Sequence, residues 1–134
     1  MMGRIEGFIE AMHIRPDDRV LEIGCGHGVA ASLVCRTLRT GCYVAVDRSR
    51  KMIAAAAQRN AAHVRVGLAS FVLAELETLD LGNRQFDKVF ALRVRLFHDE
   101  PDRAHALASR WLAPTGQLFV EYDVPAARAA SRST

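Results

Sequence analysis

Three glycines alternate with other residues directly after an apolar run that ends in a carboxylate. The segment reads VLEIGCGHG over residues 20–28, so that Glu22 precedes glycines at positions 24, 26 and 28. Glycine is needed where a side chain would block a ligand or where φ must be positive, so such a turn lets the main chain pass close beneath a nucleotide-like molecule. The carboxylate of Glu22 adds a negative charge near this glycine turn and favours a ligand with a cationic group.

Two other nucleotide-binding devices fit this spacing poorly. The dinucleotide pattern G-x-G-x-x-G, counted from Gly24, requires a glycine where the chain has Val29. A P-loop requires Gly-Lys-Ser/Thr at its end, and no such triplet follows. The glycine spacing therefore excludes a P-loop and makes a dehydrogenase a distant alternative.

A second acid stands at the end of another apolar segment. Asp47 closes CYVAVD (42–47), 19 residues after Gly28. A carboxylate at the end of a strand can accept hydrogen bonds from two ribose hydroxyls. The alternative is that Asp47 only caps a turn before Ser49.

The segment HDE (98–100) follows the apolar run FDKVFAL (86–92) and could contribute a proton acceptor. His98 could act as a general base, because imidazole accepts a proton near neutral pH. The alternative is a surface loop whose acids favour the start of a helix at Pro101. The histidines and acids in and after this segment have no recognised metal-ligand spacing, so we expect no metal site.

Apolar runs and helical periodicities alternate along the chain and predict the elements that position these residues. Strands are expected at 19–23, 42–47, 69–75, 86–92 and 117–123, and helices at 4–12, 29–38, 51–66 and 100–112. The alternation predicts an α/β fold, a doubly wound, mainly parallel five-stranded sheet with helices on both faces. We expect one domain over 1–134, with an N-terminal helix within 1–15 and a frayed tail at 125–134.

These motifs together resemble the class I S-adenosylmethionine-dependent methyltransferases. VLEIGCGHG resembles the first motif of that family and GCYVAVDRSRKM the second, while FVLAELETL, FDKVFALRVRLFH and LAPTGQLFVEY resemble the later ones, over residues 14–123. The resemblance implies a Rossmann-like fold and S-adenosyl-L-methionine as cofactor. It assigns the ribose hydroxyls to Asp47, the adenine amino group to Glu75 and the adenine ring to the backbone amide of Leu76. The implied cofactor site comprises Glu22, Gly24, Cys25, Gly26, His27, Gly28, Asp47, Arg48, Glu75, Leu76 and Leu92.

The resemblance implies transfer of the methyl group from the sulfonium to a small-molecule acceptor, with His98 as the candidate base. The alternative is a non-catalytic domain of the same fold that binds S-adenosylmethionine or S-adenosylhomocysteine, or a structural partner. Arg93 departs from the uncharged residue that relatives often carry there. Either Arg93 turns outward, or the acceptor is anionic, or cofactor binding is weakened.

The family's sheet normally continues with two more strands, which this sequence does not show. We therefore expect the edge of QLFVEY (117–122) to be covered by a second copy in a homodimer or by the tail. No nucleic-acid partner is expected, because the arginines behind the formal charge of +3 are scattered. No membrane span is expected either, because the apolar runs are short. Three cysteines without a C-x-x-C pair favour a reducing cytoplasm.

Overall fold

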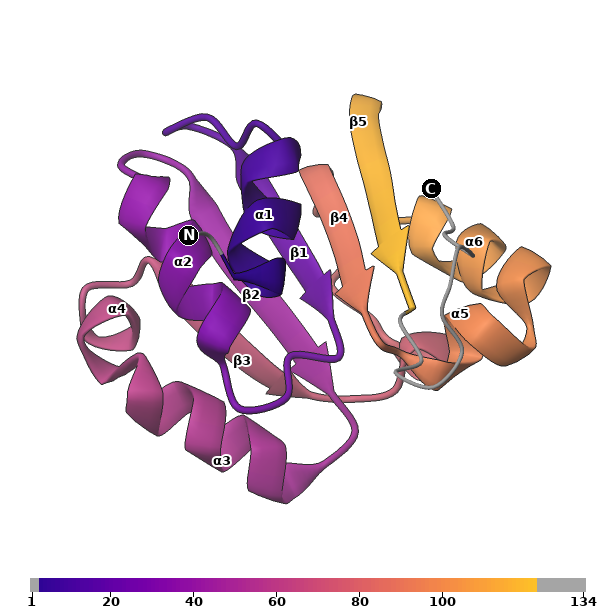
Figure 1. The fold of residues 1–134 in the computed structure, drawn as a ribbon, viewed down its shortest axis with the longest axis horizontal. Helices are drawn as coiled ribbons and strands as arrows, with labels where there is room; N and C mark the ends of the chain where they lie inside the picture. Colours follow the sequence, from indigo (N-terminus) through magenta and orange to yellow (C-terminus); the bar gives the residue numbers. More distant parts are fainter. Residues whose placement is uncertain (1–2, 123–134) are drawn as a thin grey trace.

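In the computed structural model, which describes residues 3–122, a five-stranded parallel sheet lies between two layers of helices (Figure 1). The strand order is β3-β2-β1-β4-β5, and every pair of neighbours is parallel. The strands are β1 (Arg19–Ile23), β2 (Cys42–Asp47), β3 (Ala69–Leu73), β4 (Phe86–Leu92) and β5 (Leu112–Glu121). The helices are α1 (Arg4–Ala11), α2 (Val29–Thr37), α3 (Arg50–Arg59), α4 (Ala61–Arg65), α5 (Arg95–Asp99) and α6 (Pro101–Ser109), with a 3-10 turn η1 (Leu76–Thr78).

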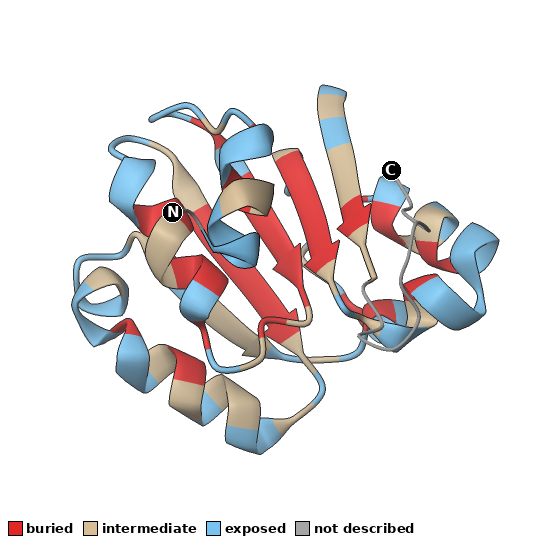
Figure 2. Cartoon of the chain, in the orientation of Figure 1, coloured by how far each residue is buried: buried red, intermediate tan, exposed pale blue. Residues whose placement is uncertain are grey.

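Side chains on the two faces of the sheet form separate hydrophobic cores. On one face Val20, Tyr43 and Phe90 pack beneath α1, α2 and α3. On the other face Leu21 and Val89 pack with η1, α5 and α6. The central strands are buried on both sides (Figure 2), which explains why their sequences are almost continuously apolar. The predicted doubly wound fold is confirmed.

The strand order reverses beside β1, and this places the ligand crevice. The chain builds β1, β2 and β3 outward in one direction and then returns to lay β4 on the opposite side of β1. The loops after β1 and β4 therefore leave the sheet in different directions, which opens a crevice at the carboxyl ends of these two strands. The glycine turn follows β1 and lies at this point.

Several predicted boundaries differ from the observed ones. The single helix expected at 51–66 is divided into α3 and α4 at Asn60, whose φ is −111° and ψ is 30°. The third strand ends at Leu73 rather than at residue 75, because the chain turns into η1. Residues 95–99 form α5, a segment for which the sequence predicted no helix, because Phe97 is buried against the second core. Such tertiary packing is not visible in a five-residue pattern.

The fifth strand begins earlier than expected and contains an irregularity. Phe86 pairs with Leu112 and Lys88 with Gln117, so residues 113–116 bulge out of β5 opposite Asp87. β5 is an outer strand of the sheet over residues 3–122. The predicted tail at 125–134, its proposed role in covering this edge and the end of the predicted strand at Asp123 lie outside the described residues.

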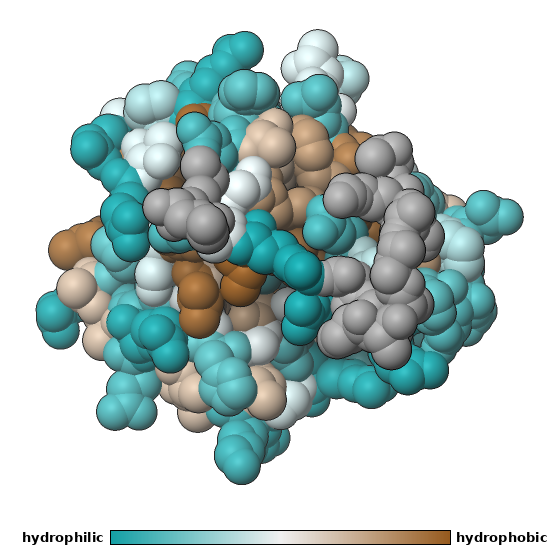
Figure 3. Space-filling view, viewed as in Figure 1, coloured by the Kyte–Doolittle hydropathy of each residue, from teal (hydrophilic) through white to brown (hydrophobic). Residues whose placement is uncertain are grey.

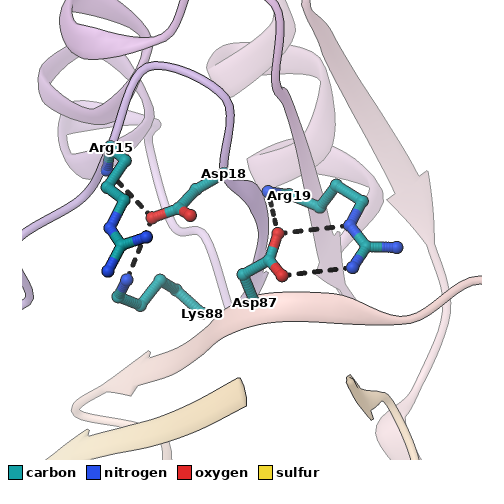
Figure 4. Close-up of polar contacts among 5 residues, drawn as sticks. All are labelled: Arg15, Asp18, Arg19, Asp87 and Lys88. Carbon is teal, nitrogen blue, oxygen red and sulfur yellow. Dashed lines mark hydrogen bonds and ion pairs between the residues drawn. The ribbon is translucent and has the colours of Figure 1, made fainter. Parts of the chain in front are cut away.

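Two ion pairs tie the amino ends of β1 and β4 together, at the end of the sheet opposite the crevice (Figure 4). Lys88 Nζ lies 2.9 Å from Asp18 Oδ2, and both side chains are less than a tenth exposed. Arg19 binds Asp87 with two guanidinium hydrogen bonds of 3.2 and 3.1 Å, and its side chain is half exposed. These hydrogen bonds lower the pKa of Asp87. The buried pair fixes the register at this end of the sheet and lies away from the site.

No helix within residues 3–122 is long and apolar enough to cross a membrane.

Candidate functional site

The glycine turn after β1 uses backbone conformations that only glycine adopts without strain. Gly24, Gly26 and Gly28 have φ angles of 76°, 52° and 90°. The N–H of Gly24 donates a 2.7 Å hydrogen bond to the carbonyl of Val46, which ties the turn to the end of β2. The alternating spacing that the sequence shows thus corresponds to three left-handed positions, at every second residue, before α2 begins.

The three glycines meet different surroundings. A Cβ built on Gly28 would lie 2.8 Å from the Cα of Ala56, and one on Gly24 would lie 2.7 Å from Cγ2 of Val94. A Cβ on Gly26 would meet no atom within 4 Å. Gly24 and Gly28 are therefore required for packing within the protein. Gly26 instead faces open space, where a ligand could approach the backbone.

Asn60 anchors the glycine turn to α3, and sequence reasoning missed it. Its buried Nδ2 donates hydrogen bonds to the carbonyls of Gly28 (3.1 Å) and Ala56 (3.0 Å). Its Oδ1 accepts a 2.8 Å hydrogen bond from the hydroxyl of Ser32. The available signal was a single asparagine within an alanine-rich helical segment, where asparagine is unfavourable unless its side chain bonds elsewhere.

Asp47 connects the end of β2 to the glycine turn. Its Oδ2 accepts a 3.1 Å hydrogen bond from the N–H of Gly26, and its Oδ1 accepts one of 2.9 Å from the N–H of Ser49. The turn-capping contact considered as an alternative is therefore present. Each carboxylate oxygen has a second lone pair, so these contacts leave acceptor capacity for hydroxyl groups of a ligand.

Glu22 is buried on β1 beside the turn. The phenol of Tyr43 donates a 2.6 Å hydrogen bond to its Oε1, and only 2% of Glu22 is exposed. Burial raises the pKa of Glu22 to about 8, and the charge of Asp47 raises it too, while the hydrogen bond from Tyr43 opposes the shift. From the sequence we expected Glu22 to carry a negative charge. In the structure, burial instead favours the protonated form of this carboxyl group, and a nearby cation would favour its ionisation.

Two clefts flank the glycine turn. The Asp47 cleft, of about 690 Å³, lies beyond the ends of β1, β2 and β4 and is bounded by η1 and α5. The α1–α2 cleft, of about 930 Å³, lies between the start of α1 and one side of α2. Both clefts are lined by Gly24, Gly26, Leu92 and Arg93, and we call these four residues the junction. One elongated ligand, or two ligands in contact, could therefore extend across the glycine turn.

Most of the predicted site residues line these clefts. The Asp47 cleft contains Asp47 itself, Arg48, Glu75, Leu76 and Leu92. Glu75 stands at the start of η1, is exposed and makes no capping hydrogen bond to that turn. The α1–α2 cleft contains Glu22, Cys25 and His27 in addition to the junction. Gly28 lines neither cleft.

Cys25 is buried within the turn and not activated. Burial raises the pKa of its thiol to about 12, with further contributions from Glu22 and Asp47. The thiol donates to the carbonyl of Gly26 at 3.6 Å. A thiol of this kind fills space rather than acting as a nucleophile.

His98 lies outside both clefts. Its ring stacks on Tyr122 with the centroids 4.5 Å apart, on the side of α5 toward the end of β5. Its proposed role as a general base stays a prediction. In residues 3–122 no group of three or more histidine, cysteine or acidic side chains could hold a metal ion.

A family model described as a methyltransferase domain matches residues 20–116, from β1 into β5. The chain belongs to this methyltransferase domain family. The match covers the glycine turn, Asp47 and the strands that carry them. It confirms the predicted class I S-adenosylmethionine-dependent family, its Rossmann-like fold and S-adenosyl-L-methionine as the cofactor of that family.

Two curated relatives and one solved structure illustrate the similarity of this methyltransferase domain. It is 38% identical over 103 residues to phthiotriol/phenolphthiotriol dimycocerosates methyltransferase 1 of Mycobacterium ulcerans, covering 75% of this chain and 36% of that protein. It is 31% identical over 112 residues to a fatty-acid O-methyltransferase of Mycolicibacterium smegmatis, covering 80% and 39%. Coclaurine N-methyltransferase, solved with N-methylheliamine and S-adenosylhomocysteine, superposes with a TM-score of 0.75 at 21% identity, covering 88% and 34%.

The similarity concerns one part of these longer proteins. The methyltransferase domain spans little more than a third of the length of the curated relatives it matches. The solved structure, at its low identity, supports the fold alone.

Proposed function

We propose that this domain binds S-adenosyl-L-methionine across the glycine turn and that it transfers the methyl group to a small-molecule acceptor. The observation that carries the proposal is the junction, where a cleft containing Asp47 meets a second, larger cleft over Gly26. When bound, the cofactor supplies an electrophilic methyl group on a sulfonium, so the protein has mainly to align the reactants and exclude water.

Residues of the Asp47 cleft fit the adenosine part of the cofactor. Asp47 would accept hydrogen bonds from the two ribose hydroxyls with the lone pairs that its backbone contacts leave. Glu75 would accept one from the adenine amino group, and the backbone amide of Leu76 would lie at the ring. Arg48 and Leu92 would line the walls. These assignments rest on the position of each residue in one cleft.

The glycine turn fits the amino-acid part. Gly26 would let the methionine chain lie on the backbone, because no atom occupies the space above it. Glu22 would ionise beside the ammonium group, since a cation favours the charged form of a carboxyl. Cys25 and His27 would lie along the same wall.

The α1–α2 cleft supports the proposal that the domain methylates a small-molecule acceptor. Apolar side chains from α1 and α2 line it, so the space suits a molecule with an apolar body. One relative is named for O-methylation of a fatty acid, which agrees with such an acceptor.

A second candidate, cofactor binding without turnover, is favoured by one observation. His98, which we considered as the base, stacks on Tyr122 outside both clefts. Acceptors that must lose a proton would then need a base from elsewhere.

Calorimetric titration followed by a turnover assay distinguishes these functions. We expect S-adenosylmethionine and S-adenosylhomocysteine to bind and NAD not to bind. Formation of S-adenosylhomocysteine with any member of a panel of acids, alcohols and amines would support transfer, and binding without turnover would favour the second candidate. Binding of NAD alone would contradict both.

We also propose a homodimer through the edge of β5 and a cytoplasmic location. β5 is an outer strand whose partly buried apolar residues would be covered by a second copy. All three cysteines are free, which suits a reducing compartment. Light scattering that shows a monomer at micromolar concentration would contradict the dimer. Fractionation of the source cells would test the location.

A further inference from the structure

The charged residues divide unevenly between the two helix layers. Residues 29–68, which form α2, β2, α3 and α4, contain seven basic residues and a single acid, Asp47. Residues 69–122, which include the helices on the other face of the sheet, contain six basic residues and eight acids. The basic residues of the first segment are Arg36, Arg39, Arg48, Arg50, Lys51, Arg59 and Arg65. The arginines that are scattered along the sequence therefore gather on one layer of the folded protein.

All of these basic residues except Arg48, which lines the Asp47 cleft, form what we call the basic layer. Each member is exposed, and none makes an ion pair within residues 3–122. Arg39 and Arg59 donate their side-chain hydrogen bonds to backbone carbonyls. The members are Arg36, Arg39, Arg50, Lys51, Arg59 and Arg65. The positive charge of this layer is therefore not neutralised by acids of the described residues, and it can attract an anionic partner.

The candidate site accounts for only a small part of the basic layer. Arg36 and Arg59 line the α1–α2 cleft. The other four members line neither that cleft nor the Asp47 cleft. Their charge is therefore available to a partner that contacts the outer face of the helices rather than the inside of a cleft.

The short helix α4 exposes apolar side chains within the same layer. Val64 is 40% exposed, and Val66, directly after the helix, is 76% exposed. Neither valine belongs to the two hydrophobic cores, and Arg65 stands between them in the sequence. Figure 3 shows hydrophobic surface at the left edge of the molecule, around the position of α4 in Figure 1, with hydrophilic side chains next to it. The exposed apolar surface of α4 is thus accompanied by basic groups.

The backbone around these valines is already hydrogen-bonded. The N–H groups of Val66, Gly67 and Leu68 donate hydrogen bonds of 2.9–3.2 Å to carbonyls of α4. The carbonyl of Leu68 accepts a 2.9 Å hydrogen bond from the N–H of Tyr43, which joins this segment to β2. Because its polar groups are paired, the segment can enter an apolar environment without leaving backbone donors unsatisfied.

This combination fits an anionic membrane surface better than a nucleic acid. Proteins that bind single strands stack bases on aromatic side chains, but the one Phe, Tyr or Trp within 29–68 is Tyr43, which is buried. Exposed valines add nothing to contacts with a phosphate backbone. At a lipid surface, by contrast, the burial of apolar side chains adds to the attraction between basic residues and anionic headgroups.

We propose that the outer face of α3 and α4 binds the surface of an anionic lipid bilayer. Val64 and Val66 enter the headgroup region, and the basic layer pairs with lipid phosphates. Such binding requires no membrane-spanning helix. It goes beyond the proposed function and does not depend on binding of the cofactor.

The test measures sedimentation of the protein with vesicles of phosphatidylcholine, or of an equal mixture of phosphatidylcholine and phosphatidylglycerol. Sodium chloride is set at about 0.05 and about 0.5 M. Arg65→Gln and Lys51→Gln are compared with Arg110→Gln, which lowers the net charge equally but lies after α6 in the opposite layer. Thermal unfolding checks that each variant is folded.

A second set of variants tests the valines. The double variant Val64→Thr/Val66→Thr keeps the shape and the β-branching of both side chains and replaces a methyl with a hydroxyl in each. Val29→Thr is the matched control, because Val29 is also 40% exposed but lies at the start of α2. Hydrogen exchange with and without vesicles locates the surface that binds.

We expect the vesicles with phosphatidylglycerol to bind at least tenfold more tightly than those without it, and the higher salt concentration to weaken this binding. Arg65→Gln and Lys51→Gln should each weaken it about fivefold, the contribution of one basic residue near anionic lipid. Val64→Thr/Val66→Thr should weaken it about tenfold. Arg110→Gln and Val29→Thr should leave it unchanged, and vesicles should protect the amides of residues 59–67.

Several results would overturn this inference while leaving the proposed function intact. Equal binding to both kinds of vesicle would exclude recognition of anionic lipid. Equal losses in Arg65→Gln and Arg110→Gln would show a response to net charge alone, and unchanged binding in the double valine variant would exclude insertion. Tighter binding to a single-stranded DNA oligonucleotide at the same salt concentration would identify a nucleic acid as the partner. Self-association without vesicles that Arg65→Gln abolishes, measured by light scattering, would identify a second copy of the protein instead.

Discussion

Tyr43 on β2 and Glu22 on β1 form a buried phenol–carboxyl hydrogen bond of 2.6 Å beside the glycine turn. The two strands are neighbours and parallel, and both side chains point to the face covered by α1 and α2. This hydrogen bond links the protonation state of Glu22 to the packing of the hydrophobic core beneath it. A ligand cation near Glu22 would therefore act on a group that burial otherwise keeps neutral.

The stability of the free protein should fall as pH rises from 5 to 8. The pKa of Glu22 is about 8 in the folded protein and near its ordinary value when unfolded, so the folded state binds the extra proton across this range. The stabilisation is complete below the unfolded pKa and is lost as pH passes through the folded one, at roughly 1 kcal/mol per pH unit. Urea unfolding at several pH values measures this slope. Glu22→Gln should flatten it, and equal slopes in both proteins would contradict the account.

Affinity for S-adenosylmethionine should increase between pH 6 and pH 8. Glu22 must lose its proton to pair with the ammonium group, so binding releases protons below a pKa of about 8. Tyr43→Phe removes the hydrogen bond that favours the carboxylate and should weaken binding at pH 7 about tenfold. Calorimetry in buffers of different ionisation enthalpy measures the proton release. A pH-independent affinity would show that Glu22 does not contact the cofactor.

Alanine at two glycines of the turn should have opposite consequences. Gly26→Ala introduces a Cβ into open space, so the fold should lose only about 1 kcal/mol from backbone strain while binding of S-adenosylhomocysteine is lost. Gly28→Ala forces a Cβ against Ala56 and Asn60 and should destabilise the fold by about 3 kcal/mol. Urea unfolding and calorimetry on each variant separate the two effects. Unchanged binding in Gly26→Ala would contradict the proposed path of the cofactor over this residue.

Asn60→Ala and Lys88→Met should both destabilise the protein, but only the first should affect the site. Asn60→Ala removes the contacts to Gly28, Ala56 and Ser32 and should cost about 2–3 kcal/mol. Lys88→Met leaves the buried Asp18 without its ion pair and should cost about 3–5 kcal/mol. Affinity for S-adenosylhomocysteine, measured at a temperature where both variants are folded, should fall in Asn60→Ala alone. Equal affinities would mean that Asn60 does not position the turn.

The sequence predicted the parts of this fold whose signals are local. β1, β2 and β4 agree with their predicted bounds because they are apolar runs buried on both faces. The glycine turn was recognisable because positive φ restricts positions 24, 26 and 28 to glycine. Asp47 was recognisable as a candidate ligand-binding residue because it is an acid that ends a buried strand, at the carboxyl edge of a parallel sheet.

The remaining features depend on contacts between distant residues. The break at Asn60 is fixed by the carbonyl of Gly28, which is 32 residues earlier. The raised pKa of Glu22 depends on its burial by residues distant in the sequence, whereas the acid alone suggested a charged group. The position of Arg93 at the junction follows from a hydrogen bond to β5 and from the packing of Val94 on Gly24. No local sequence pattern reports contacts between residues that are so far apart in the chain.

A crystal structure of the protein with S-adenosylhomocysteine tests the central claim most directly. The account predicts the ribose hydroxyls on the carboxylate of Asp47, the adenine beside Glu75 and Leu76, and the amino-acid part over Gly26 with its ammonium group near Glu22. A ligand whose ribose does not contact Asp47, or whose chain does not cross Gly26, would contradict it.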